Sequence, residues 1–383
     1  MSDASASRMG EGPCTTAALE QTLLDIWRRV LRVAEIGRDD NFFDLGGDSL
    51  LAVHLFLEIE RATGVDLPIT AIYDAPTVEE MARLLREEAA PQSSLLVLLK
   101  PGTGDPLYIV HGIGGTVMEF EKLGRHIRVP EPVYAIQAQG LDGKAAPLAT
   151  IGEIADLYVT AIRSVQPSGP YRLCGYSFGG LVAMEMATRL KAAGHGIAAL
   201  ILIDAYAHPA TWPILSRRKM RVRRALHLLW RARGRSPVET FAQALRYLKT
   251  RGYSRRLYEW LLDENPSLPL PLLRVREAGG AALRAYRPAP YAGPVTFLKA
   301  RERDSEFPDD AERIWRRLAP RAVFRTIAGG HRTIVTDHAD TAAAALTACL
   351  HSLRAGAAPQ QRHDDALAQS FDVTPSPLLR EAV

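Results

Sequence analysis

Two serines in this chain stand in settings that suit chemistry, and the two settings differ. Ser177 lies in "CGYSFGGL", which has the spacing G-x-S-x-G, and Ser49 lies in "DNFFDLGGDSLLAV", which contains the letters GDSL. A serine hydroxyl becomes a useful nucleophile only when neighbouring groups activate and position it. One chain seldom needs two serine nucleophiles of different design. The elements predicted around each serine must therefore decide its role.

Ser177 has the neighbours that a nucleophile needs in a strand-turn-helix elbow. The run "YRLC" predicts a buried strand before it, and "LVAMEMATRL" predicts a helix after it. Gly175 and Gly179 permit the strained turn that lifts the hydroxyl out of a sheet. The backbone N–H of Phe178 would then face a developing oxyanion at the helix N-terminus. The alternative interpretation is an ordinary glycine-rich turn.

A catalytic acid and a base should follow the nucleophile in the order Ser, Asp, His. Asp204 closes the apolar run "IAALILID", where an unpaired carboxylate would be costly. His331 lies in "AGGHRTIV", just after the strand-like run "AVFRTIA". We therefore expect Asp204 and His331 to act with Ser177. Asp304, in "ARERDSEF", is the rival acid. Many hydrolases with a strand-turn-helix elbow of this kind place their acid after a later strand.

A second donor to the oxyanion should come from a loop after an early strand, and "YIVHGIGGT" fits that description. Gly112, Gly114 and Gly115 would let the backbone approach a ligand closely. The main-chain N–H of Ile113 is our candidate donor. We interpret His111 as a structural loop residue rather than as a second base.

Ser49 has no predicted strand before it. A GDSL esterase would place its serine at a strand end and would carry a matching Asp-x-x-His near the C-terminus. The segment "TDHAD", with Asp337 and His338, lacks that spacing. Ser49 instead opens the apolar helical run "SLLAVHLFLEIERATG", and a helix N-terminus favours an incoming phosphate. This is the setting of a phosphopantetheine attachment site.

Patterns along the 383 residues indicate two domains. Helical periodicity and the capping-box pair Thr77 and Glu80 predict a small all-α bundle near the N-terminus. Strand-like runs then alternate with helical stretches, which predicts a mostly parallel sheet with helices on both faces. The expected boundaries are a disordered lead at 1–14, the bundle at 15–90, a linker at 91–96, the α/β domain at 97–355 with a helical lid at about 207–290, and a disordered tail at 356–383.

Composition excludes several classes of protein. The net charge of +4 is too small to indicate nucleic-acid binding, and no apolar run approaches the 18 residues of a membrane span. The N-terminus lacks the layout of a signal peptide. Cys14, Cys174 and Cys349 are far apart, so they form neither a metal spacing nor a disulfide framework. We expect no metal and a cytoplasmic location.

The chain also resembles a known family. The segment "DNFFDLGGDSLLAVHLFLEIE" closely resembles the thiolation (peptidyl carrier) domains of nonribosomal peptide synthetases. "YIVHGIGGT", "YRLCGYSFGGLVAMEMA", "LILIDAY" and "IAGGHRTIV" are similar to the type I thioesterase domains that end those assembly lines. The resemblance implies a four-helix carrier bundle followed by an α/β-hydrolase domain with a helical lid.

By that resemblance, Ser49 carries a covalent 4'-phosphopantetheine arm, and Ser177, Asp204 and His331 form the catalytic triad. It implies as partners a phosphopantetheinyl transferase and an adenylation, condensation or other acyl-loading enzyme. That enzyme would act in trans or upstream, since the chain begins with Met and shows neither an adenylation nor a condensation domain. The expected function is release of an acyl, aminoacyl or peptidyl thioester through a serine acyl-enzyme, by hydrolysis or cyclisation.

Three alternatives stay open. The chain could be a free-standing serine esterase with an accessory helical bundle. It could be an acyltransferase that passes the acyl group to an amine or alcohol. It could also be a binding module in which the hydrolase fold is only a scaffold, although an intact Ser-Asp-His set argues against that interpretation.

Overall fold

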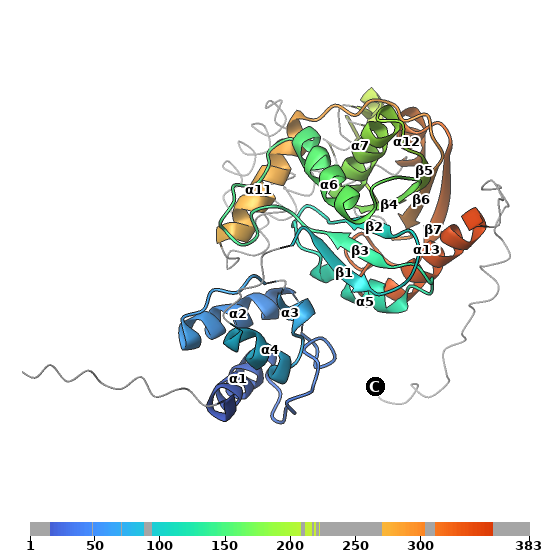
Figure 1. Ribbon diagram of the computed structural model, residues 1–383. Helices are drawn as coiled ribbons and strands as arrows, with labels where there is room; N and C mark the ends of the chain where they lie inside the picture. Colours follow the sequence, from blue (N-terminus) through green and yellow to red (C-terminus); the bar gives the residue numbers. More distant parts are fainter. Residues whose placement is uncertain are drawn as a thin grey trace, which may run out of the picture.

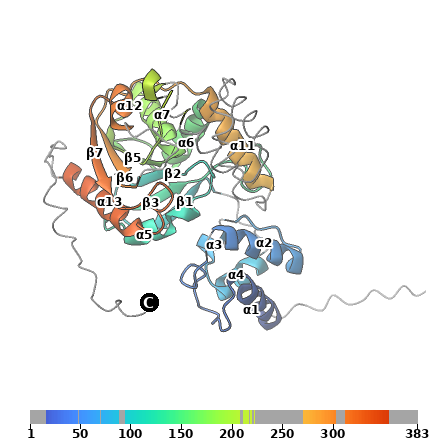
Figure 2. The same cartoon turned by 180° about the vertical axis from the view of Figure 1, so that it is seen from behind.

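The computed structural model describes two bodies, a small all-helical one and a larger α/β one (Figure 1). We call them the helical bundle and the α/β domain. Figure 2 shows the same two bodies from behind, with the bundle below the α/β domain. The residues described are 16–47, 49–69, 71–87, 94–207, 211–216, 218, 219, 222, 270–302 and 311–354.

The helical bundle has four helices: α1 (Thr16–Leu31), α2 (Ser49–Thr63), α3 (Ala71–Asp74) and α4 (Val78–Arg86). Their apolar faces enclose one core, which includes the fully buried side chains of Trp27, Phe42 and Ile59. The expected capping box is present at the start of α4. Thr77 Oγ1 accepts the backbone N–H of Glu80, and the Glu80 carboxylate accepts the backbone N–H of Thr77, each at 3.2 Å.

The α/β domain is built on a seven-stranded sheet in the order β1-β3-β2-β4-β5-β6-β7. The β1–β3 pair is antiparallel and every other pair is parallel. The strands are β1 (Leu96–Lys100), β2 (Leu107–Val110), β3 (Val133–Ile136), β4 (Tyr171–Tyr176), β5 (Ile197–Ile203), β6 (Val295–Ala300) and β7 (Ala322–Ile327). The strand β1 begins at the last residue of the predicted linker.

Because helices cover both faces of this sheet, β2 and β5 are apolar runs rather than alternating ones, and β4 is buried along most of its length. One core contains side chains of α6 (Ile151–Val165), α7 (Phe178–Ala192), α11 (Leu270–Ala285) and α12 (Ala311–Leu318). The opposite core contains side chains of η1 (Met118–Phe120), α5 (Glu121–His126) and α13 (Ala339–Arg354). In Figure 2, α5 and α13 lie on the side of the sheet away from α6 and α7.

Several expectations fall outside the described residues. These are the disordered lead and tail, and most of the lid at 207–290. Within that range, the structure describes residue 207, residues 211–216, 218, 219 and 222, α11 and the residues after it; Trp212 is buried in the core that also contains side chains of α7. Among the described residues, no helix is both long and apolar enough to cross a membrane.

Candidate functional site

The site lies where strands of the parallel sheet reach their carboxyl ends. Ser177 directly follows β4, Asp204 directly follows β5, and His331 follows β7 by a short loop. Carboxyl ends of parallel strands meet at one edge of a sheet, which is where open α/β sheets bind ligands. The topology therefore brings three residues together that are far apart in the sequence.

The backbone at Ser177 is strained in the way that a nucleophile elbow requires. Its φ of 53° and ψ of −116° lie in a region that L-residues seldom adopt. The turn is tight enough that a Cβ on Gly175 would lie 2.2 Å from the carbonyl oxygen of Gly179. A Cβ on Gly179 would lie 2.3 Å from the carbonyl oxygen of His111. Both glycines of the motif are thus required by close backbone approach.

Ser177, His331 and Asp204 form a continuous hydrogen-bonded chain. The Ser177 hydroxyl lies 3.0 Å from Nε2 of His331, and Nδ1 of His331 lies 2.9 Å from Oδ2 of Asp204. Because the carboxylate can only accept, Nδ1 carries a proton and Nε2 is left as the acceptor for the serine proton. This is the tautomer that a general base needs in order to activate the hydroxyl.

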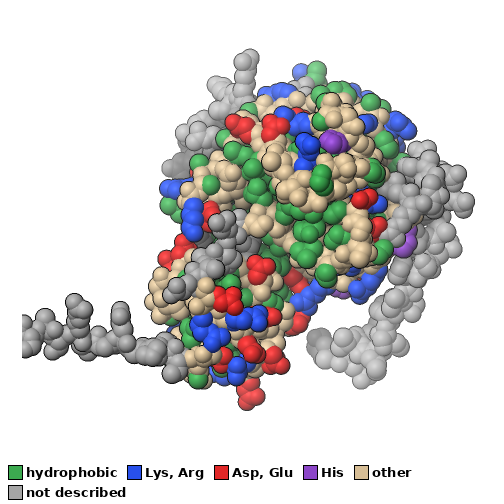
Figure 3. All heavy atoms as spheres, viewed as in Figure 1, with side chains coloured by type: hydrophobic (Ala, Val, Ile, Leu, Met, Phe, Trp, Pro, Cys, Tyr) green, Lys and Arg blue, Asp and Glu red, His purple; other side chains and the backbone are tan. Residues whose placement is uncertain are grey.

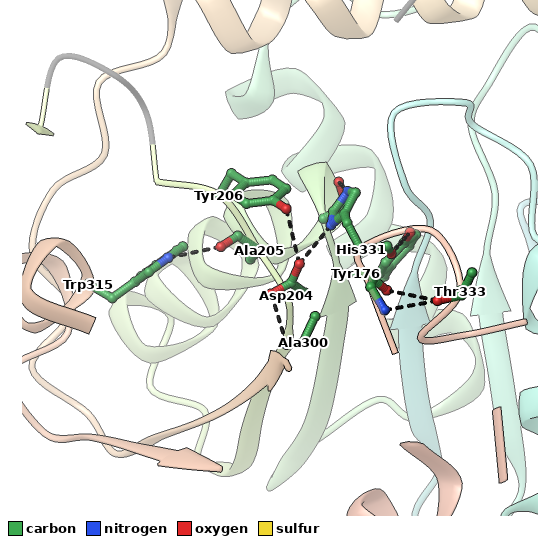
Figure 4. A network of polar contacts seen from close by, with 10 residues as sticks. Tyr176, Asp204, Ala205, Tyr206, Ala300, Trp315, His331 and Thr333 are labelled. Atoms are coloured by element: carbon green, nitrogen blue, oxygen red, sulfur yellow. Dashed lines mark hydrogen bonds and ion pairs between the residues drawn. The ribbon is translucent and has the colours of Figure 1, made fainter. Parts of the chain in front are cut away.

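The carboxylate of Asp204 accepts hydrogen bonds from three neighbouring groups (Figure 4). The residue is 1% exposed and has a positive φ of 39°. Its Oδ1 accepts the backbone N–H of Ala300 at 3.1 Å, and its Oδ2 accepts the Tyr206 hydroxyl at 3.1 Å as well as His331. Each of these bonds stabilises the charged form of a carboxylate that burial would otherwise penalise. Asp304, the rival acid, lies outside the described residues.

The loop that carries His331 is fixed by its neighbours as well (Figure 4). The Tyr176 hydroxyl donates to the carbonyl oxygen of His331 at 2.6 Å, and the two rings stack with centroids 5.4 Å apart. Thr333 Oγ1 accepts the backbone N–H of Gly330 at 2.9 Å. Gly329 has a φ of +90° and no room for a side chain, since a Cβ would lie 2.5 Å from His338.

Sequence reasoning gave no role to Tyr176 or Tyr206. Tyr206 lies two residues after Asp204, in contact with both the acid and the imidazole, whose ring centroid is 4.5 Å from its own. Tyr176 immediately precedes the nucleophile. A tyrosine at a strand end is so common a core residue that the sequence alone offers no signal for either position.

The two expected oxyanion donors lie beside one cavity. Its lining includes Ile113 and Phe178, together with His111, Tyr158 and Val275. Phe178 is the first residue of α7, so its N–H belongs to the unsatisfied N-terminal turn of that helix. His111 is buried, which lowers its pKa to about 4, and its Nε2 lies 2.6 Å from the Tyr158 hydroxyl.

Glu119 was not singled out by any motif, yet it holds the loop that carries Ile113. Its Oε1 accepts the backbone N–H of Gly112 at 3.1 Å. Withdrawal of this carboxyl from water raises its pKa to about 7, although the bond from Gly112 acts in the opposite direction. Glu119 therefore changes charge near neutral pH while it supports the loop.

Replacing Glu119 by glutamine should change how stability depends on pH. The pKa of Glu119 is higher in the folded chain than its ordinary value of 4.5, so its contribution to stability is full below pH 4.5 and is lost as pH rises through 7. Glutamine does not titrate. Relative to wild type, the unfolding free energy of Glu119→Gln should rise by about 3 kcal/mol between pH 4.5 and 8, as denaturant titration would show. A difference that is constant over this range would contradict the assignment.

Ser49 lies apart from this site, at the first residue of α2 in the helical bundle. The loop before it is shaped by glycine, since Gly46 has a φ of +89° and a Cβ on Gly47 would lie 2.3 Å from the Phe42 ring. The first turn of α2 has no acidic residue to oppose an anion. A 15-residue helix that begins at a serine in this way fits a phosphate attached to that serine.

Two family models match the chain in succession. The phosphopantetheine attachment site model matches residues 21–85, and the thioesterase domain model matches residues 105–350, which is well over half of the chain. The chain belongs to the thioesterase domain family and carries a phosphopantetheine-binding carrier domain before it. These matches and the sheet topology confirm the predicted fold class. The α/β domain is thus a thioester hydrolase, and the cofactor that the carrier domain implies is a covalently attached 4'-phosphopantetheine.

Relatives of the chain are large synthetases. The dimodular nonribosomal peptide synthase of Bacillus subtilis (strain 168) is 42% identical over 207 residues, which is 53% of this chain and 9% of that protein. Indigoidine synthase of Dickeya dadantii (strain 3937) is 41% identical over 186 residues, 48% of this chain and 12% of that protein. A solved four-domain nonribosomal peptide synthetase bound to AMP and glycine aligns with a TM-score of 0.53 and 27% identity, covering 91% of this chain and 27% of that one. The chain therefore spans only a small part of each relative.

Proposed function

We propose that this chain releases an acyl, aminoacyl or peptidyl group from its own carrier domain, as the terminal unit of a nonribosomal-peptide-type assembly line. The observation that carries the proposal is the Ser177–His331–Asp204 chain of hydrogen bonds, at 3.0 and 2.9 Å, on the same polypeptide as a helix that begins at Ser49. The synthetases to which the chain is similar support this role.

Ser49 is the residue that we propose to hold the arm. When bound, 4'-phosphopantetheine supplies a thiol on which the substrate is held as a thioester. A phosphopantetheinyl transferase is the partner that would attach it, and an adenylation, condensation or other acyl-loading enzyme would supply the acyl group. We place these reactions in the cytoplasm, which is supported by Cys174 and Cys349 standing as free thiols.

The residues of the triad would act as follows. His331 Nε2 takes the proton of Ser177 as the serine oxygen attacks the thioester carbonyl, and Asp204 stabilises the charged imidazole. The oxyanion forms against the backbone N–H groups of Ile113 and Phe178. The carbon–sulfur bond then breaks, and the proton on His331 passes to the departing thiolate. His331 next removes a proton from water, or from an amine or alcohol of the substrate, as that group attacks the acyl-serine ester; the ester bond breaks and the proton returns from His331 to the Ser177 oxygen.

A direct test follows the fate of a loaded acyl group. We expect wild-type chain, loaded with an acyl-phosphopantetheine by a promiscuous transferase, to release the free acid much faster than the same thioester hydrolyses in buffer. The same reaction with an added amine or alcohol separates hydrolysis from the acyltransferase alternative. Chromatography shows the free acid in the first case and the amide or ester in the second. A chain that retains its acyl group for as long as Ser177→Ala does would contradict the proposal.

A further inference from the structure

Within the described residues, the contacts given for the helical bundle on the α/β domain fall on residues 117–125, which comprise Val117, η1 and most of α5. The hydroxyl of Tyr73, on α3, donates to the carbonyl oxygen of Val117 at 3.1 Å. Burial and the nearby carboxyl groups of Glu121 and Glu119 raise the pKa of Tyr73 above its ordinary value, so this hydroxyl stays protonated as a donor. Figures 1 and 2 both show α3 and α5 facing one another.

Apolar packing reinforces this contact. Met118 belongs to the α/β domain by sequence, yet its side chain is 6% exposed and packs within the core of the helical bundle. Tyr73 is packed against the core of the bundle and also against the α/β core that contains Val117 and Phe120. The two cores are therefore joined through a tyrosine from one body and a methionine from the other.

A charged side chain also bridges the two bodies and orients the bundle at this contact. Arg125 on α5 pairs with Asp44 in the loop before α2, and its Nη2 donates to Asn41 at 3.4 Å. Figure 3 shows blue and red side chains meeting where the two bodies touch. Exposed ion pairs contribute little to stability, so we regard this one as orienting the bundle rather than holding it. The apolar pair Tyr73 and Met118 should provide most of the attachment.

The opposite side of the same segment holds the loop that carries Ile113. Glu119 follows Met118 directly and accepts the backbone N–H of Gly112. Gly112 has little freedom there, because a Cβ would lie 3.0 Å from the Glu119 carboxyl and 3.2 Å from the ring of Tyr176. Val117, Met118 and Glu119 thus contact the bundle with one set of groups and the loop with another.

We propose that residues 117–119 couple docking of the helical bundle to the geometry of the oxyanion loop, with Glu119 as the positioning residue. The docked bundle fixes Val117 and Met118, and Glu119 then holds Gly112 and with it the N–H of Ile113. This proposal rests on the proposed function, in which Ile113 donates to the oxyanion. Its consequence is that the bundle promotes catalysis even on a substrate that never uses the phosphopantetheine arm.

The first test replaces Glu119 by leucine and by glutamine in the full chain without the arm. Both substitutions keep the volume of the side chain, but only glutamine keeps a carbonyl oxygen that can accept from Gly112. On a small soluble thioester, we expect Glu119→Leu to lower kcat on the order of 10-fold with little change in KM, because oxyanion donors act mainly in the transition state. The variant Glu119→Gln should keep most of the wild-type kcat.

The second test disturbs the bundle side of the contact. Tyr73→Ala should lower kcat on the same soluble thioester by roughly 5-fold, within the range of typical coupling between sites. Tyr73→Phe, which keeps the ring, should lower it less. The matched control is Leu57→Ala, which removes another partly exposed apolar side chain of the bundle, on α2, and should leave kcat unchanged. Unfolding curves of each variant show that the bundle is folded.

Ser177→Ala separates failure of this coupling from failure of the proposed function. If Ser177→Ala is inactive while Glu119→Leu and Tyr73→Ala both keep the wild-type kcat, the coupling is overturned and the proposed function stands. If Glu119→Gln is as slow as Glu119→Leu, the acceptor role of Glu119 is overturned. If Ser177→Ala itself remains active, the proposed function fails first.

Discussion

Replacing Ser177 by alanine should lower kcat on a small soluble thioester by 10⁴-fold or more. The substitution removes the proposed nucleophile but leaves the proposed oxyanion donors and the binding surface, which alone supply only a residual rate of about 10³- to 10⁴-fold over water in serine hydrolases. The Ser177 hydroxyl lies 3.0 Å from His331 Nε2, within hydrogen-bond distance of the proposed base.

The measurement is the steady-state rate of thioester hydrolysis, in which a thiol reagent detects the released thiol. Circular dichroism is the control for folding. The strained backbone at position 177 gives a second expectation. Alanine adopts a φ near 53° no more easily than serine does, so Ser177→Ala should be about as stable as wild type. A variant that is folded and still hydrolyses the thioester within 10-fold of wild type would show that Ser177 is structural.

Replacing Ser49 by alanine should abolish turnover of arm-loaded substrate while leaving hydrolysis of a small soluble thioester unchanged. Ser49 begins α2 in the helical bundle, whereas the triad is built on β4, β5 and β7 of the α/β domain. The substitution should therefore remove the proposed attachment point without altering the site at which we propose that the ester forms. Attachment is all-or-none for each chain, so the expected loss is complete rather than graded.

The control for this experiment is an exposed residue of the same helix, and Arg61→Ala serves because its side chain pairs only with Glu58 in the contacts described for it. It should accept the arm and turn over normally. If Ser49→Ala also lost activity on the small thioester, Ser49 would be acting in catalysis, as a GDSL esterase would require. If it still accepted the arm, the attachment site would lie elsewhere.

The sequence predicted those parts of the fold whose signal is periodic. The runs "YRLC", "IAALILID" and "AVFRTIA" are the strands β4, β5 and β7 of one sheet, and the capping pair Thr77 and Glu80 marks the start of α4. The short helix α3, Ala71–Asp74, could not be predicted from helical periodicity, because four residues make barely one turn. The antiparallel edge pairing of β1 with β3 could not be predicted either, since a strand pattern does not specify its neighbour.

The site was predictable only as far as local motifs extend. Ser177, Asp204 and His331 each follow a recognisable strand, so their juxtaposition could be expected from a parallel sheet alone. Tyr206 and Glu119 act through contacts made by folding, and neither stands in a motif. The docking of Tyr73 on Val117 joins residues 44 positions apart through tertiary packing, which no local pattern records.

We propose that Ser49 holds the substrate through the arm and that Ser177 receives the acyl group from it. Peptide mass mapping after brief reaction of acyl-loaded protein and rapid acid quench tests this claim most directly. We expect the phosphopantetheine on the peptide that contains Ser49, and in wild type a transient acyl ester on the peptide that contains Ser177. In Ser177→Ala the acyl group should remain entirely on the Ser49 peptide. An arm attached elsewhere, or an acyl group that leaves wild-type protein without ever appearing on the Ser177 peptide, would contradict the account.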